Sequence, residues 1–159
     1  MEDKEYKRFL YKALRYLAYR PRSEKEVRDA LIKKKAPASV IDKIIQWLKE
    51  KRFINDDEFA RWWIEQRARF KPKGARIIKM ELMQKGLHYD IIASAFENIE
   101  EDSISEEEQV KKIVMKKIGK YSLLPKQEIY KKLGAFLARR GYSWEIIKSS
   151  IDDVLSKGV

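Results

Sequence analysis

Apolar residues recur every three to four positions through most of this chain, which is the spacing of amphipathic α-helices. The first segment places Phe9, Ala13 and Leu17 on one side and ends before a proline at position 21. Ser23, with Glu26 three residues later, then predicts a capping box that opens a second helix. A third helix follows Pro37, and Ser39 is its expected cap. Residues 1–54 therefore predict three short helices.

The same three-helix pattern returns twice. In the second round Asn55 or the acids after it offer a helix cap, and the apolar stripe behind them is Phe59, Trp63 and Phe70. Sliding the chain over itself aligns apolar positions at offsets of 51 and then 55 residues. The aligned sets are Leu31 with Leu82 and Leu137, Ile41 with Ile92 and Ile147, and Leu48 with Ile99 and Val154.

This periodicity, with few glycines and prolines and no strand-like alternation, predicts an all-α protein. We expect three tandem three-helix repeats in an elongated, curved arrangement, with domains at 1–54, 55–102 and 103–159. Each repeat is small enough that it should lean on its neighbour for stability.

Charge is spread unevenly over these repeats. The chain has 36 basic and 25 acidic residues, net +11, which divides into +8 for residues 1–55, −2 for 56–102 and +5 for the remainder. The basic residues of the middle repeat lie between Arg61 and Lys85, and acids gather from Glu97 to Glu108. This acidic stretch predicts either a rigid helix end or a hinge.

Helical projection separates exposed from buried positions in the middle repeat. Arg76 and Lys79 project opposite Ile78 and Leu82, and so toward solvent or a partner. Trp62 leaves the apolar stripe and has the character of an interface anchor among arginines. We assign the other three tryptophans to the core: Trp47, Trp63 and Trp144.

Composition excludes most catalytic chemistry. There is no cysteine and a single histidine, His88, at a turn between helices where a solvent-facing or capping role is expected. Asp56 and its acidic neighbours open a helix, so we expect a cap there and no metal site. No phosphate-binding glycine loop occurs, so we predict a protein without catalytic residues or cofactors. No apolar run would cross a bilayer, and we expect a cytoplasmic monomer without membrane contact.

Three groups of residues together resemble the RecX regulatory proteins. They are Arg22, Ser23, Glu26 and Val27, then Phe53 to Ala60, then Arg67, Gly74, Ile78, Glu81, Leu82, Lys85 and Gly86. The resemblance covers nearly the whole chain and is weakest over residues 100–125. It implies three tandem three-helix repeats. It also implies a protein that binds RecA, settles in the groove of the RecA filament on single-stranded DNA, and lowers filament growth, ATP turnover, strand exchange and LexA cleavage.

Charge and helical facing suggest which side chains would touch the filament or DNA phosphates. The candidates are Arg61, Trp62, Arg67, Arg69, Lys71, Lys73, Arg76 and Lys79 at the centre, with Lys111, Lys112, Arg139 and Arg140 at one end. Capping of filament ends, lining of the groove and removal of subunits are all compatible with this surface.

The alternative hypothesis is a nonspecific DNA-binding protein built of helix-turn-helix-like repeats. Weak direct DNA binding fits the net charge. The third helix of each of the first two repeats, however, has few side chains able to read base edges. Sequence-specific recognition is therefore not expected.

Overall fold

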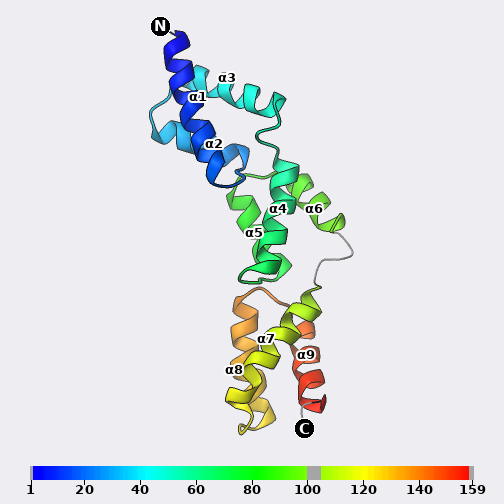
Figure 1. Cartoon of the computed structure of the whole chain (residues 1–159). Coiled ribbons are helices and arrows are strands. Elements are labelled where there is room, and N and C mark those ends of the chain that lie inside the picture. The colour runs from blue at the N-terminus through cyan, green and yellow to red at the C-terminus, as the bar shows by residue number, and fades with distance from the viewer. Residues whose placement is uncertain (1, 100–104, 158–159) are drawn as a thin grey trace. The chain divides into compact units, whose positions relative to one another are not determined.

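The computed structural model describes residues 2–99 and 105–157, and over these ranges it contains helices joined by short turns (Figure 1). The elements follow the predicted order in three sets of three. Their bounds are α1 Glu2–Tyr19, α2 Glu24–Lys33, α3 Ala38–Glu50, α4 Asp56–Arg69, α5 Ala75–Gln84, α6 Tyr89–Glu97, α7 Glu106–Tyr121, α8 Lys126–Arg139 and α9 Trp144–Lys157. Within these described ranges no strand occurs, so the all-α prediction is confirmed.

The helix starts are set by local capping chemistry. The Ser23 hydroxyl accepts a hydrogen bond from the Glu26 N–H, and the Glu26 carboxylate accepts one from the Ser23 N–H, which completes the predicted capping box. Asn55 caps α4 by accepting from the Glu58 N–H at 3.0 Å, and His88 caps α6. The prediction for α3 is wrong in detail, because Pro37 and not Ser39 stands at its N-cap.

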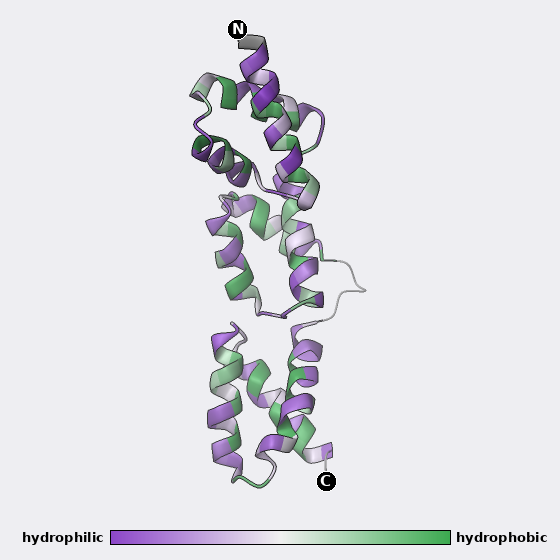
Figure 2. Ribbon diagram, turned by 60° about the vertical axis from the view of Figure 1, so that its left-hand side comes forward, coloured by the Kyte–Doolittle hydropathy of each residue, from purple (hydrophilic) through white to green (hydrophobic). Residues whose placement is uncertain are grey.

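The chain divides into two compact units. The first contains the described residues up to Trp63 together with Glu81–Ile99, and the second contains Ile64–Met80 together with the described residues from Ser105 onward. The helices α4 and α5 each contribute residues to both units. Green and purple stretches alternate along the helical ribbons in Figure 2, as expected for amphipathic helices.

Each unit has its own apolar core. In the first unit, α1, α2 and α3 pack against one another around Phe9, Leu31, Ile44 and Leu48. In the second, α7, α8 and α9 enclose a core of buried aliphatic side chains and one tyrosine: Val110, Val114, Ile129, Leu133, Leu137, Tyr142, Ile147 and Ile151. The aligned leucines at 31, 82 and 137 are all buried, as the repeat pattern predicts.

Three apolar residues depart from their predicted places. Phe70 was assigned to the α4 stripe, but the helix ends at Arg69 and 65% of Phe70 is exposed. Trp144 was assigned to the core and is 53% exposed, since it is the first residue of α9. Ile99, aligned with the buried Leu48, follows the end of α6 and is also exposed.

Candidate partner-binding surface

The predicted surface residues fall mostly in the second unit. Arg61 and Trp62 belong to the first unit, and the other ten belong to the second. Arg76 and Lys79 are exposed while Ile78 and Leu82 are buried, so helical projection gave the correct facing for α5.

The second unit brings separate basic segments together through their backbones. The N–H of Gly74, in the turn before α5, donates to the carbonyl oxygen of Arg140 at 2.7 Å. A Cβ on Gly74 would lie 2.1 Å from the carbonyl oxygen of Gly141, so the two glycines permit this close approach. The basic residues around positions 71–76 therefore flank those at 139 and 140.

The start of α7 completes this junction. The Glu106 carboxylate accepts a hydrogen bond from the Ala75 N–H, and the Gln109 side chain accepts one from the Tyr142 hydroxyl at 2.9 Å. Burial, with the Glu106 carboxylate nearby, raises the pKa of Tyr142 to about 12, against a smaller opposing effect of Arg140. The hydroxyl therefore stays protonated and keeps donating.

Sequence reasoning did not identify the residues that form this junction, Gly74, Glu106, Gln109 and Gly141. Glu106 was read as part of the acidic stretch, yet it lies in the first turn of α7, where Ser105 caps the helix. Residues 100–104 of that stretch lie outside the described residues. The glycine pair at 74 and 141 was the available signal, because both stand at helix ends.

Some of the candidate side chains already interact with other residues of the chain, whereas others are exposed and form no ion pair in the described residues. Lys111 contacts Asp153 at 3.0 Å and lowers the pKa of that carboxyl, and Arg69 contacts Glu65 at 2.8 Å. The Arg140 guanidinium lies 4.7 Å from the Phe136 ring centroid. The half-buried Arg67 and Lys73 and the exposed Lys79 have further interactions. Within the described residues, the exposed candidates with no ion pair are Arg61, Lys71, Arg76, Lys112 and Arg139.

Trp62 is half-buried and has neighbours within the first unit. Its ring lies 6.1 Å from Phe59 and 6.2 Å from Trp63, and the Arg20 guanidinium lies 5.9 Å from its centroid. Trp63 donates through its indole N–H to Glu81 at 3.3 Å. Part of Trp62 remains accessible to a partner. Trp63, which was assigned to the core, is only half-buried.

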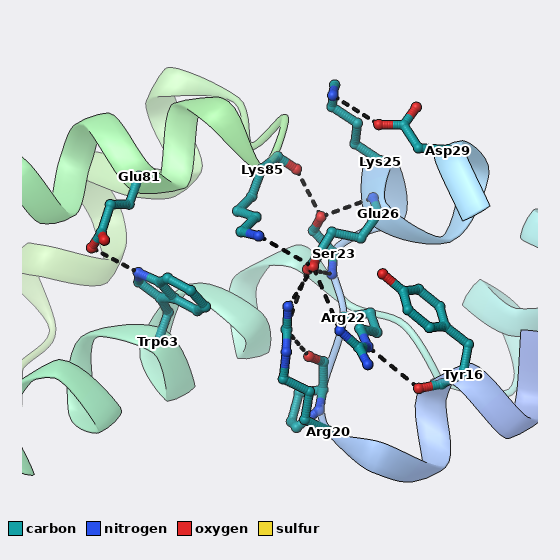
Figure 3. Close-up of polar contacts among 11 residues, drawn as sticks. Tyr16, Arg20, Arg22, Ser23, Lys25, Glu26, Asp29, Trp63, Glu81 and Lys85 are labelled. Atoms are coloured by element: carbon teal, nitrogen blue, oxygen red, sulfur yellow. Dashed lines mark hydrogen bonds and ion pairs between the residues drawn. The ribbon is translucent and has the colours of Figure 1, made fainter. Parts of the chain in front are cut away.

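Four residues that carry the family resemblance take part in a polar network around Glu26 in the first unit (Figure 3): Arg22, Ser23, Glu26 and Lys85. The carboxylate of Glu26 contacts Arg20 at 2.5 Å and Lys85 at 3.4 Å, and the Ser23 hydroxyl donates to the Lys85 carbonyl oxygen at 2.7 Å. Burial opposes ionisation of Glu26, but the hydrogen bonds from Arg20 and the Ser23 N–H outweigh it and lower its pKa. These residues join α2 to the turn after α5.

A hollow of about 270 Å³ also occurs in the first unit, beside the start of α4. Three of its polar residues pair with one another, since Glu24 contacts Lys49 at 3.0 Å and the Glu24 N–H donates to Asp56. No group of three metal-binding side chains occurs in the described part of the chain. The helix-cap interpretation of this acidic segment fits the Asn55 geometry.

Comparison with known proteins gives the family. Three family models match in sequence order: the first three-helix domain of RecX over residues 10–48, the second over 55–95 and the third over 105–151. The chain belongs to the RecX family. A regulatory protein RecX from Bacillus pumilus is 36% identical over 149 residues, and one from Clostridium tetani is 35% identical over 147 residues.

The RecX relatives differ in length. The chain is matched over 92% and 90% of its own length, but it spans 55% of the Bacillus pumilus protein and 65% of the Clostridium tetani protein. The crystal structure of RecX from Lactobacillus salivarius superimposes with a TM-score of 0.82 at 26% identity, covering 96% of this chain and 97% of that one. The three-helix repeats are thus shared with a solved RecX structure. Within the described ranges, no helix combines the length and hydropathy needed to span a membrane.

Proposed function

We propose that this RecX-family protein binds RecA and lies in the groove of the RecA filament on single-stranded DNA. Bound there, it restrains ATP turnover, strand exchange and LexA cleavage, and so modulates DNA repair and the SOS response. The observation that carries the proposal is the match of all three RecX three-helix domains along the chain. Inhibition would come from occupying the groove, with no chemistry by the inhibitor.

The exposed cations of the second unit support this function. Lys71, Arg76 and Arg139 lie around the junction of Gly74 with Arg140, and the described residues give them no ion pair. Exposed cations without an ion-pair partner favour encounter with an acidic protein surface or with DNA phosphates. Several contacts along a polymer would add through effective concentration.

The direct test measures RecA ATP turnover on single-stranded DNA with this protein added well below the RecA concentration. We expect slower turnover and fewer joint molecules. A charge-reversed variant, Lys71→Glu with Arg76→Glu and Arg139→Glu, should lose most of the inhibition and show a flatter salt dependence. Its matched control reverses three exposed cations at the end of α2 and in the turn after it, Lys33, Lys34 and Lys35. No inhibition even at equal stoichiometry would refute the proposed function.

Nonspecific DNA binding is the second candidate, favoured by the net charge of +11. The third helix of the middle set, α6, exposes Tyr89, Asp90, Ser94 and Glu97, which form no base-reading face. Binding to bare single-stranded DNA and to RecA filaments at physiological salt distinguishes the two functions. Equal affinity for both would favour a simple DNA-binding protein.

A further inference from the structure

The outer side of α1 is a continuous surface that the core of the first unit does not use. Its inner side packs Phe9 and Ala13 into that core. The exposed side chains recur at helical spacing over one third of the helix circumference. They are Lys4, Lys7, Arg8, Tyr11, Arg15, Ala18 and Tyr19, and we call this set the α1 face.

Within the part of the chain that the structure describes, the cations of the α1 face form no ion pair. From residue 4 to residue 19 the sequence contains one acid, Glu5, which is half-buried and lies outside the α1 face. Within the described residues no ion pair involves Lys4, Lys7, Arg8 or Arg15, whereas Arg20 and Arg22 just beyond them both contact Glu26. Lys4 and Arg8 are like charges at i,i+4, a pairing that costs a helix a few tenths of a kcal/mol. This arrangement favours an anionic ligand.

Two exposed tyrosines lie among these cations. Tyr11 is 63% exposed and Tyr19 is 80% exposed, and the Arg15 guanidinium lies 5.9 Å from the Tyr11 ring centroid. Ala18 is the only aliphatic side chain of the α1 face. Planar rings alternating with guanidinium and ammonium groups match a ligand that offers both phosphates and unpaired bases, because bases stack on tyrosine while phosphates contact the cations.

The dimensions of the α1 face favour a strand over a folded protein. From Lys4 to Tyr19 the helix rises by about 22 Å, at about 1.5 Å per residue. A stable protein interface needs about 800 Å² on each partner with an apolar centre, which one helix face with a single alanine does not offer. An intact duplex would contact the cations but would leave its base faces stacked internally.

We propose that the α1 face binds a single strand of nucleic acid, with Arg8 and Arg15 on phosphates and Tyr11 and Tyr19 stacked on bases. The site is separate from the cations of the second unit, and its test needs no RecA. Its failure and the failure of the proposed function are therefore distinguishable.

The experiment measures binding of the full chain to a labelled twelve-residue thymidine oligonucleotide by fluorescence anisotropy over a range of salt concentrations. Arg8→Gln with Arg15→Gln should make the slope of log affinity against log salt shallower by about 1.4, since each phosphate contact on a single strand contributes about 0.7. The matched control, Lys33→Gln with Lys34→Gln, removes two exposed cations from the same unit. An equal effect of both pairs would overturn the proposal.

The tyrosines provide an independent readout. Tyr11→Ala with Tyr19→Ala should weaken binding of the oligonucleotide at least about thirtyfold, since each of the two lost base stacks accounts for about fivefold or more. The same alanine variant should bind an abasic strand of equal length as well as the unchanged protein does. The conservative variant, Tyr11→Phe with Tyr19→Phe, should keep the affinity of the unchanged protein for the oligonucleotide. Equal losses with both strands, or competition by polyglutamate as strong as by the oligonucleotide, would assign the α1 face to acidic ligands in general and refute the proposal. Circular dichroism of each variant verifies the helix content.

Discussion

The two units hold the middle helices by different means. In the first unit, the turn after α5 is tied to α2 by charged and polar side chains centred on Glu26. In the second, the turn before α5 meets the turn between α8 and α9 through backbone, at Gly74 and Gly141. The first junction depends on charge and hence on pH, whereas the second depends on the absence of two Cβ atoms.

The largest expected effect comes from filling the glycine contact. In Gly74→Ala the new Cβ would lie 2.1 Å from the Gly141 carbonyl oxygen and 2.8 Å from the Tyr142 nitrogen. Overpacking against backbone and loss of the hydrogen bond to Arg140 should lower the free energy of unfolding by about 3 kcal/mol, measured by urea denaturation. The control Gly119→Ala, with nothing within 4 Å, should stabilise α7 by about 1 kcal/mol. A similar small effect of both changes would contradict the steric account.

The charged junction should respond less strongly. Glu26→Gln keeps the capping box but removes the charge facing Arg20 and Lys85, which should cost about 2 kcal/mol at pH 7. The folded pKa of Glu26 is lowered from 4.5, so its stabilisation is present above that value and is lost as pH falls through the folded pKa. Urea denaturation should therefore show that the free energy of unfolding falls less between pH 7 and pH 3 in the variant than in the unchanged protein. The control is Asp29→Asn, whose exposed pair with Lys25 should contribute less than about 0.5 kcal/mol.

The smallest effect is expected at Asp56, with the opposite sign. Burial raises the pKa of Asp56 from 3.8, and the nearby Glu24 carboxylate adds to this against the hydrogen bond from the Glu24 N–H. Ionised Asp56 is therefore unfavourable in the fold, and its cost appears as pH rises through 3.8 toward the folded pKa. Asp56→Asn should stabilise the protein at pH 7 by no more than about 0.5 kcal/mol, after solvent screening, and should have no effect at pH 3. Destabilisation at pH 7 in thermal melts would refute this sign.

Sequence periodicity predicted the helices and most of the core, and its errors share one cause. Phe70 and Ile99 follow the last residue of a helix, and Trp144 is the first residue of one. Helical projection assumes that the regular backbone continues, so it assigns a wrong facing where the helix has ended or is only starting. Leu31, Leu82 and Leu137, well inside their helices, were placed correctly.

The candidate surface was less accessible to sequence reasoning, because pairing depends on contacts between distant residues. Lys111 and Asp153 are 42 positions apart, so the residues next to each of them in the sequence do not predict their ion pair. The role of Glu106 in holding the turn before α5 likewise follows only from the fold. The α1 face was not singled out from the sequence, although the scarcity of acids around it can be read there. The structure adds that these positions are exposed and that the neighbouring Arg20 and Arg22 are paired with Glu26.

The exposed position of Trp144 makes its fluorescence a probe of the second unit. Its indole lies over Gly134, where a Cβ would come within 3.0 Å of the ring, and its edge meets Tyr130. The other three tryptophans, at positions 47, 62 and 63, all belong to the first unit and are half-buried. Tryptophan fluorescence that iodide quenches readily should thus arise mainly from the second unit. Intrinsic fluorescence can therefore report ligand binding at either unit without an attached dye.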